Sequence, residues 1–154
     1  MPQWAATGEI FVRRFTILSA LAALALAQPA WAEVGRIKSQ VGEVQVIRNG
    51  HAFVAKPGFK LEQGDVVATG KTGRVGIAFL DNTRMALGPK SRITLDEFSY
   101  DRSRQTGSFV TSVNRGSVGV VSGNIAKSKR DAMRVRTPTS MLGVRGTKFV
   151  VEVK

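Results

Sequence analysis

The sequence predicts an all-β fold. From Val34 onward the chain has no sustained helical periodicity, and short runs of β-branched residues recur with turn residues between them. Of the 16 glycines, all but Gly8 follow residue 32, where they make up about 12% of the chain against an average near 7%. A chain with this pattern turns often, so we expect short strands joined by tight turns.

Residues 1–32 are predicted to be a secretory signal peptide. Arg13 and Arg14 form its positive flank, and residues 15–27 form an apolar stretch of about a dozen residues. The stretch is followed by Ala30 and Ala32, which make an A-x-A cleavage motif around Trp31.

Cleavage of this segment is favoured over an uncleaved anchor. A membrane-spanning helix needs about 20 apolar residues, and Gln28 and Pro29 interrupt this stretch too early. We therefore expect a mature chain that starts at Glu33 and forms one domain over residues 33–154. It would have no lasting transmembrane segment and a periplasmic or secreted location.

The composition excludes several kinds of site. The chain has no cysteine, so we expect a domain held by packing and sheet hydrogen bonds, without disulfides or Cys-based zinc sites. His51 is the one histidine, so a His-rich metal site cannot form within one subunit. We expect no metal and no cofactor.

The predicted domain is strongly basic. It holds 21 of the 23 Lys and Arg residues and 10 of the 11 acidic residues, which leaves a net charge of +11. A field of this sign favours anionic partners such as acidic polysaccharide, lipid headgroups or nucleic acid. Solubility alone explains the charge equally well, so the charge by itself selects no function.

The first half of the domain is predicted to contain short strands between glycine turns. Residues 42–48 and 51–55 form a hairpin at Asn49-Gly50, a dipeptide that readily takes the positive φ values of a type I′ turn. Residues 74–80 are apolar or small on both faces, so we expect this strand to be covered on both sides. The other strands predicted here are residues 66–69, 83–87 and 92–97.

The second half is predicted to alternate strands with polar loops. The expected strands are residues 108–113, 116–121 and 133–137, and a last strand that begins at Thr147. Residues 99–106 are expected to form a loop, and residues 122–132 a mobile basic loop that carries Lys127, Lys129 and Arg130.

An ordered set of turn and strand residues between positions 41 and 153 resembles the FecR domain family. The set comprises Gly58, Leu61, Gly64-Asp65, Val67, Thr69-Gly70, Asp81-Asn82-Thr83, Leu87, Ser91, Leu95, Val135, Thr137-Pro138 and Val144-Arg145-Gly146-Thr147-Lys148-Phe149. Each dipeptide is common in β proteins, but the ordered set that ends in the Arg-Gly-Thr signature is specific. The resemblance implies a solenoid-like or rolled β-sheet, and periodicity leaves a β-sandwich as the alternative.

The motif residues are interpreted as structural. Gly64 and Gly70 suit backbone positions with positive φ, and Asp65 is expected to bond its own downstream amides in an Asx turn. Arg145 is expected to point inward beside Gly146, held by carbonyls or a carboxylate. The same structural interpretation applies to Thr69, Asp81, Thr83 and Thr147. Asn82 stands where the family more often has glycine, and Asn tolerates the same left-handed conformation.

Two departures from the family limit what the resemblance implies. Its best-known members span the inner membrane, with a cytoplasmic segment that controls a sigma factor and a periplasmic domain that senses an outer-membrane receptor. Nothing precedes the predicted signal here, so we do not expect sigma-factor control. FecR domains also often continue beyond the Arg-Gly-Thr strand. Either a final turn of sheet is missing, or an edge strand with Lys148 and Lys154 is open to strand addition by a partner.

Catalysis is not expected. The adjacent Asp96 and Glu97 would point to opposite faces of a strand, which prevents paired carboxylate chemistry. His51 is the one imidazole base for any serine, and its place beside the hairpin turn predicts an exposed residue. The glycine-rich residues 116–123 lack the Gly-Lys-Ser/Thr ending that binds phosphate.

Two binding functions remain. The leading hypothesis is an exported, non-enzymatic module that senses or assembles in the cell envelope through an envelope protein partner. The alternative is a basic module that binds an anionic polysaccharide or lipid headgroup. Nucleic acid is not expected, because most aromatic residues lie at core positions of strands and export removes the usual target. The candidate anion-binding residues are Lys127, Lys129, Arg130, Arg134 and Arg136.

Overall fold

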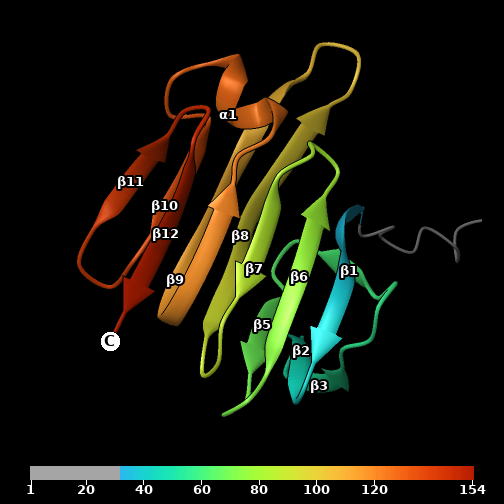
Figure 1. The fold of residues 1–154 in the computed structure, drawn as a ribbon. Helices are drawn as coiled ribbons and strands as arrows, with labels where there is room; N and C mark the ends of the chain where they lie inside the picture. The colour runs from blue at the N-terminus through green and yellow to red at the C-terminus, as the bar shows by residue number, and fades with distance from the viewer. Residues whose placement is uncertain (1–31) are drawn as a thin grey trace, which may run out of the picture. The chain divides into compact units, whose positions relative to one another are not determined.

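The computed structural model describes residues 32–154, which form twelve strands and one short helix (Figure 1). The elements are β1 (Glu33–Val41), β2 (Val44–Arg48), β3 (His51–Val54), β4 (Lys60–Glu62), β5 (Val66–Thr69), β6 (Arg74–Phe79), β7 (Arg84–Leu87), β8 (Arg92–Asp101), β9 (Thr106–Val121), α1 (Asn124–Ser128), β10 (Met133–Arg136), β11 (Met141–Val144) and β12 (Lys148–Val153). The all-β prediction is confirmed. The predicted signal peptide lies outside the described residues, apart from Ala32.

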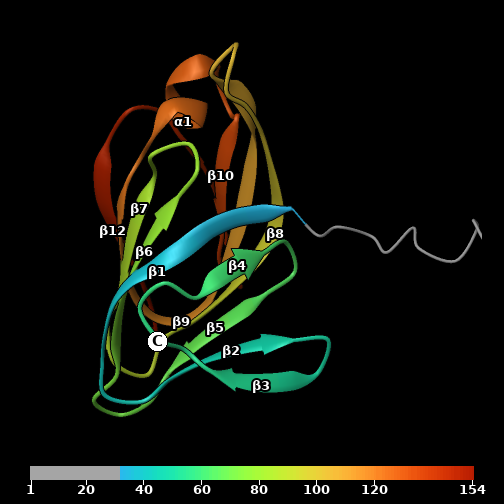
Figure 2. The same ribbon diagram turned by 90° about the vertical axis from the view of Figure 1, so that its right-hand side faces the viewer.

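All twelve strands belong to one hydrogen-bonded sheet. Its main path runs β3-β2-β5-β8-β9-β7-β6-β1-β4, while β10 and β12 also pair with β9, and β11 pairs with β10. The sheet curls into a half-barrel, with the core on its inner face (Figure 2). The rolled-sheet prediction is therefore confirmed over a sandwich of two separate sheets, because β9 carries the hydrogen bonding from one half to the other.

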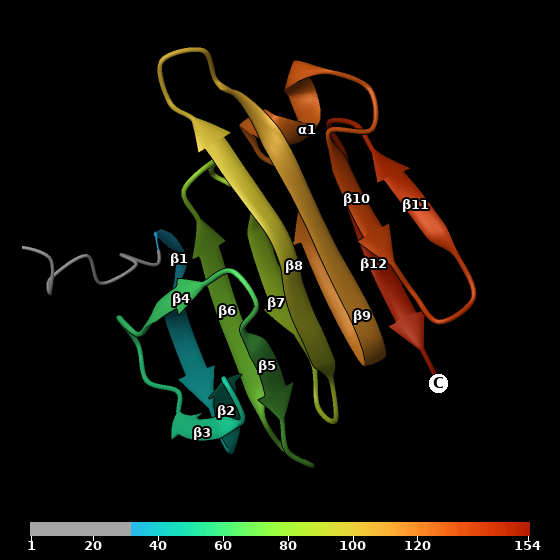
Figure 3. The same cartoon turned by 180° about the vertical axis from the view of Figure 1, so that it is seen from behind.

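The long strand β9 divides the sheet into two halves at Gly116. Residues 106–115 pair with β8, and residues 109–112 also pair with β10. Residues 116–121 pair with β12, and residues 118–121 also pair with β7. We call β4, β1, β6, β7, the end of β9 and β12 the front half, and β3, β2, β5, β8, the start of β9, β10 and β11 the back half (Figures 1 and 3).

Gly116 makes the bend in β9 sterically possible. Its φ is +87°, which favours glycine, and a side chain there would overlap Ser91. The sequence predicts two strands separated at this glycine. The structure instead shows one bent strand, because the sheet hydrogen bonds continue on both sides of the bend.

The core lies between the two halves. Phe109 from the back half is fully buried. Its ring centroid lies 4.7 Å from that of Phe79 in the front half and 5.1 Å from that of Phe98. Strand β6 contributes Val75, Ile77 and Phe79 to this core. Its other face is only half-buried and carries Gly76 and Ala78. The prediction that this strand is covered on both sides is therefore wrong.

Local turn chemistry explains where the other sequence predictions succeed. Asn49 and Gly50 have φ of 51° and 78° and join β2 to β3, as the type I′ prediction requires. Asn82 adopts the left-handed conformation with φ 67°.

Two predicted loops are more ordered than expected. Half of residues 99–106 extend β8 and β9 as paired strands around a turn at residues 102–105, and Phe98 and Tyr100 pack against the core. The predicted mobile basic loop contains α1, whose Ile125 and Ala126 are fully buried. Burial of these two apolar residues fixes a segment that its lysines suggest is mobile. Strands β1, β4 and β11 are not predicted by the sequence pattern.

Candidate functional site

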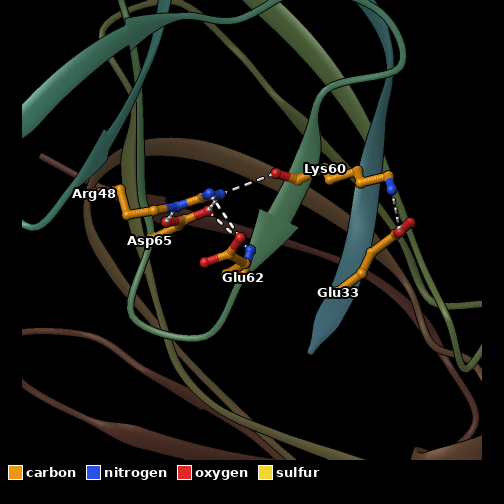
Figure 4. Close-up of polar contacts among 5 residues, drawn as sticks. All are labelled: Glu33, Arg48, Lys60, Glu62 and Asp65. Atoms are coloured by element: carbon orange, nitrogen blue, oxygen red, sulfur yellow. Dashed lines mark hydrogen bonds and ion pairs between the residues drawn. The ribbon is translucent and has the colours of Figure 1, made fainter. Parts of the chain in front are cut away.

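Asp65 of the Gly64-Asp65 motif forms a partly buried ion pair with Arg48 (Figure 4). The Asp65 side chain is fully buried, and its Oδ1 and Oδ2 accept bonds of 2.8 Å each from Nε and Nη2 of Arg48. Arg48 Nη1 also donates to Glu62 Oε1 at 2.7 Å. The bond with Asp65 raises the pKa of Arg48 above its ordinary value, although partial burial opposes the shift.

This ion pair connects the two ends of the curled sheet. Arg48 ends β2 in the back half, and its Nη2 also donates to the Lys60 carbonyl of β4 in the front half. Asp65 accepts from the amide of Glu62, which precedes it, so the predicted bonding to downstream amides is wrong. Gly64 has the expected positive φ, +89°. Sequence reasoning missed Arg48, whose only sequence signal is an arginine at the end of a hairpin strand.

Thr69 belongs to a second polar cluster, which holds the bend in β9. Its Oγ1 donates to the Gly88 carbonyl at 2.7 Å and accepts from the Ser91 amide at 2.8 Å. Ser91 Oγ in turn accepts from the Ser117 amide and donates to the Ser117 carbonyl. Gly70 does not have positive φ. A side chain there would instead meet the Glu43 side chain, 2.7 Å from its carboxylate and 3.0 Å from its Cβ.

Asp81 and Thr83 anchor the start of α1. Both are fully buried, and Asp81 Oδ2 accepts from Thr83 Oγ1 at 2.7 Å. Thr83 Oγ1 accepts from the Gly123 amide at 3.0 Å, and the Asp81 carbonyl accepts from the Asn124 amide at 2.7 Å. These motif residues therefore connect the turn between β6 and β7 to the segment that follows β9.

The Arg-Gly-Thr signature is only partly structural. Thr147 exchanges hydrogen bonds with Ser122, and Gly146 has φ +58°. Arg145, however, is exposed, so the prediction that it is held inward is wrong. It lines a depression of about 390 Å³ together with Arg130, Asp131 and Gly143.

The five predicted anion-binding residues do not form one linear motif on one element. Lys127 lies in α1, and Lys129 and Arg130 are exposed in the loop that follows it. Arg134 and Arg136 lie on β10 of the back half, where Arg134 is half-buried.

A second set of cations lies on the outer face of the front half. Arg36, Arg84 and Lys148 are exposed and belong to β1, β7 and β12. Two depressions lie along this face, of about 690 and 420 Å³, and both are lined by Arg84. Sequence reasoning missed these residues, because their alignment depends on the register of the strands.

The residues considered for catalysis are not assembled into a site. Asp96 accepts a bond of 2.6 Å from Ser112, His51 is exposed in β3, and Glu97 follows a β-bulge. Residues 32–154 contain no cluster of acidic or histidine side chains that could hold a metal ion. Within the same range, no helix is long and apolar enough to cross a membrane.

Comparison with known proteins places the chain in a family. The family model described as FecR protein matches residues 65–154. A solved structure described as a cell surface anchoring domain is similar over 40% of this chain and 82% of its own, with 37% identity and a TM-score of 0.38. No curated protein matches the sequence. The family match covers more than half of the chain, and it includes the buried Asp65, the Asp81 anchor and the Arg-Gly-Thr signature. The protein belongs to the FecR family.

Proposed function

We propose that this FecR domain is a non-enzymatic protein-interaction module of the cell envelope, which acts in sensing or assembly. The observation that carries the proposal is the open edge of β12. Within residues 32–154, β12 pairs with β9 on one side and with no other strand. It has six residues, whereas the other edge strands β3, β4 and β11 have three or four. A partner strand therefore finds its longest template here.

The register of β12 identifies the backbone groups that a partner would bind. The Ser122 amide donates to the Thr147 carbonyl, and hydrogen-bonded pairs alternate along an antiparallel ladder. The amides of Lys148, Val150 and Glu152 therefore face away from β9. The Val150 side chain is 73% exposed, which leaves apolar surface beside the free backbone groups.

A location in the cell envelope is supported by the predicted signal peptide and by membership of the FecR family. Charged side chains at Lys148, Glu152 and Lys154 flank the open edge. Such charges discourage indiscriminate pairing of exposed edges, so the edge is protected without being covered.

The test removes one edge amide without touching the ladder to β9. Val150→Pro deletes an outward N–H, and proline is tolerated on an edge strand. Val150→Thr is the matched control, because it changes the side chain but keeps the amide. Cross-linking in intact cells should recover a recurrent protein partner with the wild type and with Val150→Thr, and should lose it with Val150→Pro. Recovery of only lipid or glycan from the wild type would contradict the proposal.

A second candidate function is binding of an anionic envelope polymer or lipid headgroup at the loops beside α1. The observation that favours it is the depression shared by Arg130 and Arg145, neither of which forms an ion pair with the described residues. The Lys127 side chain lies about 4.0 Å from where a Gly146 Cβ would be, so it extends toward the same signature loop. Reversal of Lys127, Lys129 and Arg130 to Glu should abolish salt-sensitive envelope association. Unchanged association would remove this candidate.

A further inference from the structure

We propose that the outer face of the front half binds a linear anionic polysaccharide along the row formed by Arg36, Arg84 and Lys148. This inference concerns the face of the sheet and does not depend on strand addition at the edge of β12. It also uses none of the five basic residues that the sequence singles out.

The register of four strand pairs places the three cations in one line. Arg36 lies opposite Ala78, and Ala78 lies opposite Arg84 on the next strand. Arg84 lies opposite Val121, and Val121 lies opposite Lys148. Residues directly opposite one another in a sheet share a face, so all five side chains lie on the same surface.

The spacing of the row is regular. Neighbouring strands lie about 4.8 Å apart, and the cations occur on every second strand. Their backbone positions therefore recur about every 10 Å across the sheet. An extended chain with charges at regular intervals matches such a row better than a compact ligand with one charged group.

The surface between the cations is hollowed by two depressions. The first depression, about 690 Å³, holds Arg36, Ala78 and Arg84 in its lining. The second, about 420 Å³, holds Arg84, Val121 and Lys148. The next cross-strand row is Gly76, Ala86, Gly119 and Val150, so little side-chain volume fills the space between them. Arg84 lines both depressions, and one chain can therefore pass from one to the other.

The charge along the row is only partly neutralised by the protein. Arg36 is bonded to Glu33, which is itself 3.9 Å from Lys60. Arg84 and Lys148 form no ion pair with the described residues. Lys38 is exposed and adds a fourth cation to the rim of the first depression.

These features favour a glycan over the other anionic polymers and surfaces. Single-stranded nucleic acid binds through bases stacked on aromatic side chains, whereas the two aromatic residues in the linings, Phe79 and Phe149, belong to the core or pack against it. A bilayer surface is nearly flat on this scale and would contact the rims while leaving the hollows empty. A linear polysaccharide with carboxylates or phosphates fills the hollows and meets the cations in turn.

The experiment measures binding of the purified domain to a fluorescent polygalacturonate, with neutral dextran as a blank. Arg84→Gln combined with Lys148→Gln should weaken binding about tenfold, because two exposed ion pairs are lost. The plot of the logarithm of the binding constant against the logarithm of the salt concentration should become less steep, with a slope smaller in magnitude by about 1.5. Lys56→Gln with Lys71→Gln removes the same charge from two exposed loop positions outside both depressions, and it should change neither value by more than about twofold.

A steric variant separates binding in the hollow from general attraction to a basic protein. Ala86 is exposed and lines the second depression, so Ala86→Phe narrows it without any change of charge. We expect at least threefold weaker binding of polygalacturonate, with an unchanged melting temperature. Equal losses from the Lys56 and Lys71 variant, or full binding by Ala86→Phe, would overturn the proposal.

Two further measurements separate this site from the other proposals. Arg84→Gln should weaken polygalacturonate binding and leave the protein cross-link at the edge of β12 unchanged, because Arg84 lies on β7. Vesicles of phosphatidylcholine with phosphatidylglycerol should not compete with the glycan. If they compete and bind more tightly than polygalacturonate, the surface recognises a membrane and the polysaccharide assignment is wrong.

Discussion

Arg48 and Asp65 form a two-bond ion pair that holds the open side of the curled sheet together. Both bonds are 2.8 Å, and the pair joins the end of β2 to the loop between β4 and β5. Asp65 is fully buried, whereas the Arg48 side chain is 25% exposed. The carboxylate therefore depends on Arg48 for its charge balance, while Arg48 retains some contact with water and a second partner in Glu62.

Asp65→Asn should destabilise the domain by about 2–3 kcal/mol. Loss of one member of a buried pair typically costs more, but the exposure of Arg48 and its bond to Glu62 reduce the effect. The free energy of unfolding is measured by urea denaturation. Glu62→Gln is the control. It should lower the free energy of unfolding by less than about 1 kcal/mol, because Arg48 keeps both of its hydrogen bonds to Asp65. Equal effects of the two variants would contradict the central role of Asp65.

Gly116→Ala should destabilise the domain by about 2–5 kcal/mol. The added methyl group meets Ser91, and the left-handed backbone adds its own cost. Gly119→Ala, three residues later in the same strand, meets only the Ala86 carbonyl at 3.9 Å and should change stability by less than about 1 kcal/mol. Thermal unfolding followed by circular dichroism gives both values. A Gly116→Ala protein as stable as Gly119→Ala would show that β9 can bend without this glycine.

Thr83→Val should loosen the start of α1. The substitution removes the bonds from Thr83 to Asp81 and from Gly123 to Thr83, at a cost of about 2 kcal/mol. Amide hydrogen exchange should accelerate at Gly123 and at Ile125, whose amide also bonds Asp81. Thr94→Val removes an exposed bond to Asn114 and should leave both amides protected. Unchanged exchange in Thr83→Val would indicate that burial of Ile125 alone fixes the helix.

The pKa of Asp101 should lie below its ordinary value in the folded protein. The hydroxyl of Ser103 donates to its carboxylate, with weaker help from the amides of Arg104 and Ser103. Because the folded pKa is depressed, the associated stability is present above the unfolded pKa near 3.9 and is lost as pH falls through the folded value. An NMR titration should show the pKa of Asp101 rising in Ser103→Ala. An identical titration curve in both proteins would exclude the hydroxyl as the cause.

Features that depend on neighbouring residues could be predicted from the sequence. The Asn49-Gly50 hairpin and the left-handed Asn82 follow from the φ preferences of those residues. The motif residue Gly64 likewise has the positive φ that its being a glycine predicts. β11 was missed because Met141–Val144 is short and carries no alternation, and pairing with β10 alone defines it as a strand.

Features that depend on the closure of the sheet could not be predicted. Arg48 meets Asp65 only because the curl brings together residues 17 positions apart. Arg36, Arg84 and Lys148 come from three strands, and a shift of one residue in any register would move a cation to the other face. The sequence predicts that carbonyls or a carboxylate hold Arg145 inward beside Gly146, yet the loop leaves it in contact with solvent.

The bent strand β9 also determines the order in which this molecule can acquire its fold. Both halves of the sheet meet through it, because it pairs with β7, β8, β10 and β12. A ribosome releases the chain from its N-terminus, so residues 33–101 emerge before the strand that joins them. Until then the two halves lack the strand that joins them, and Phe79 and Phe98 lack their contacts with Phe109. Assembly is therefore a late, long-range event.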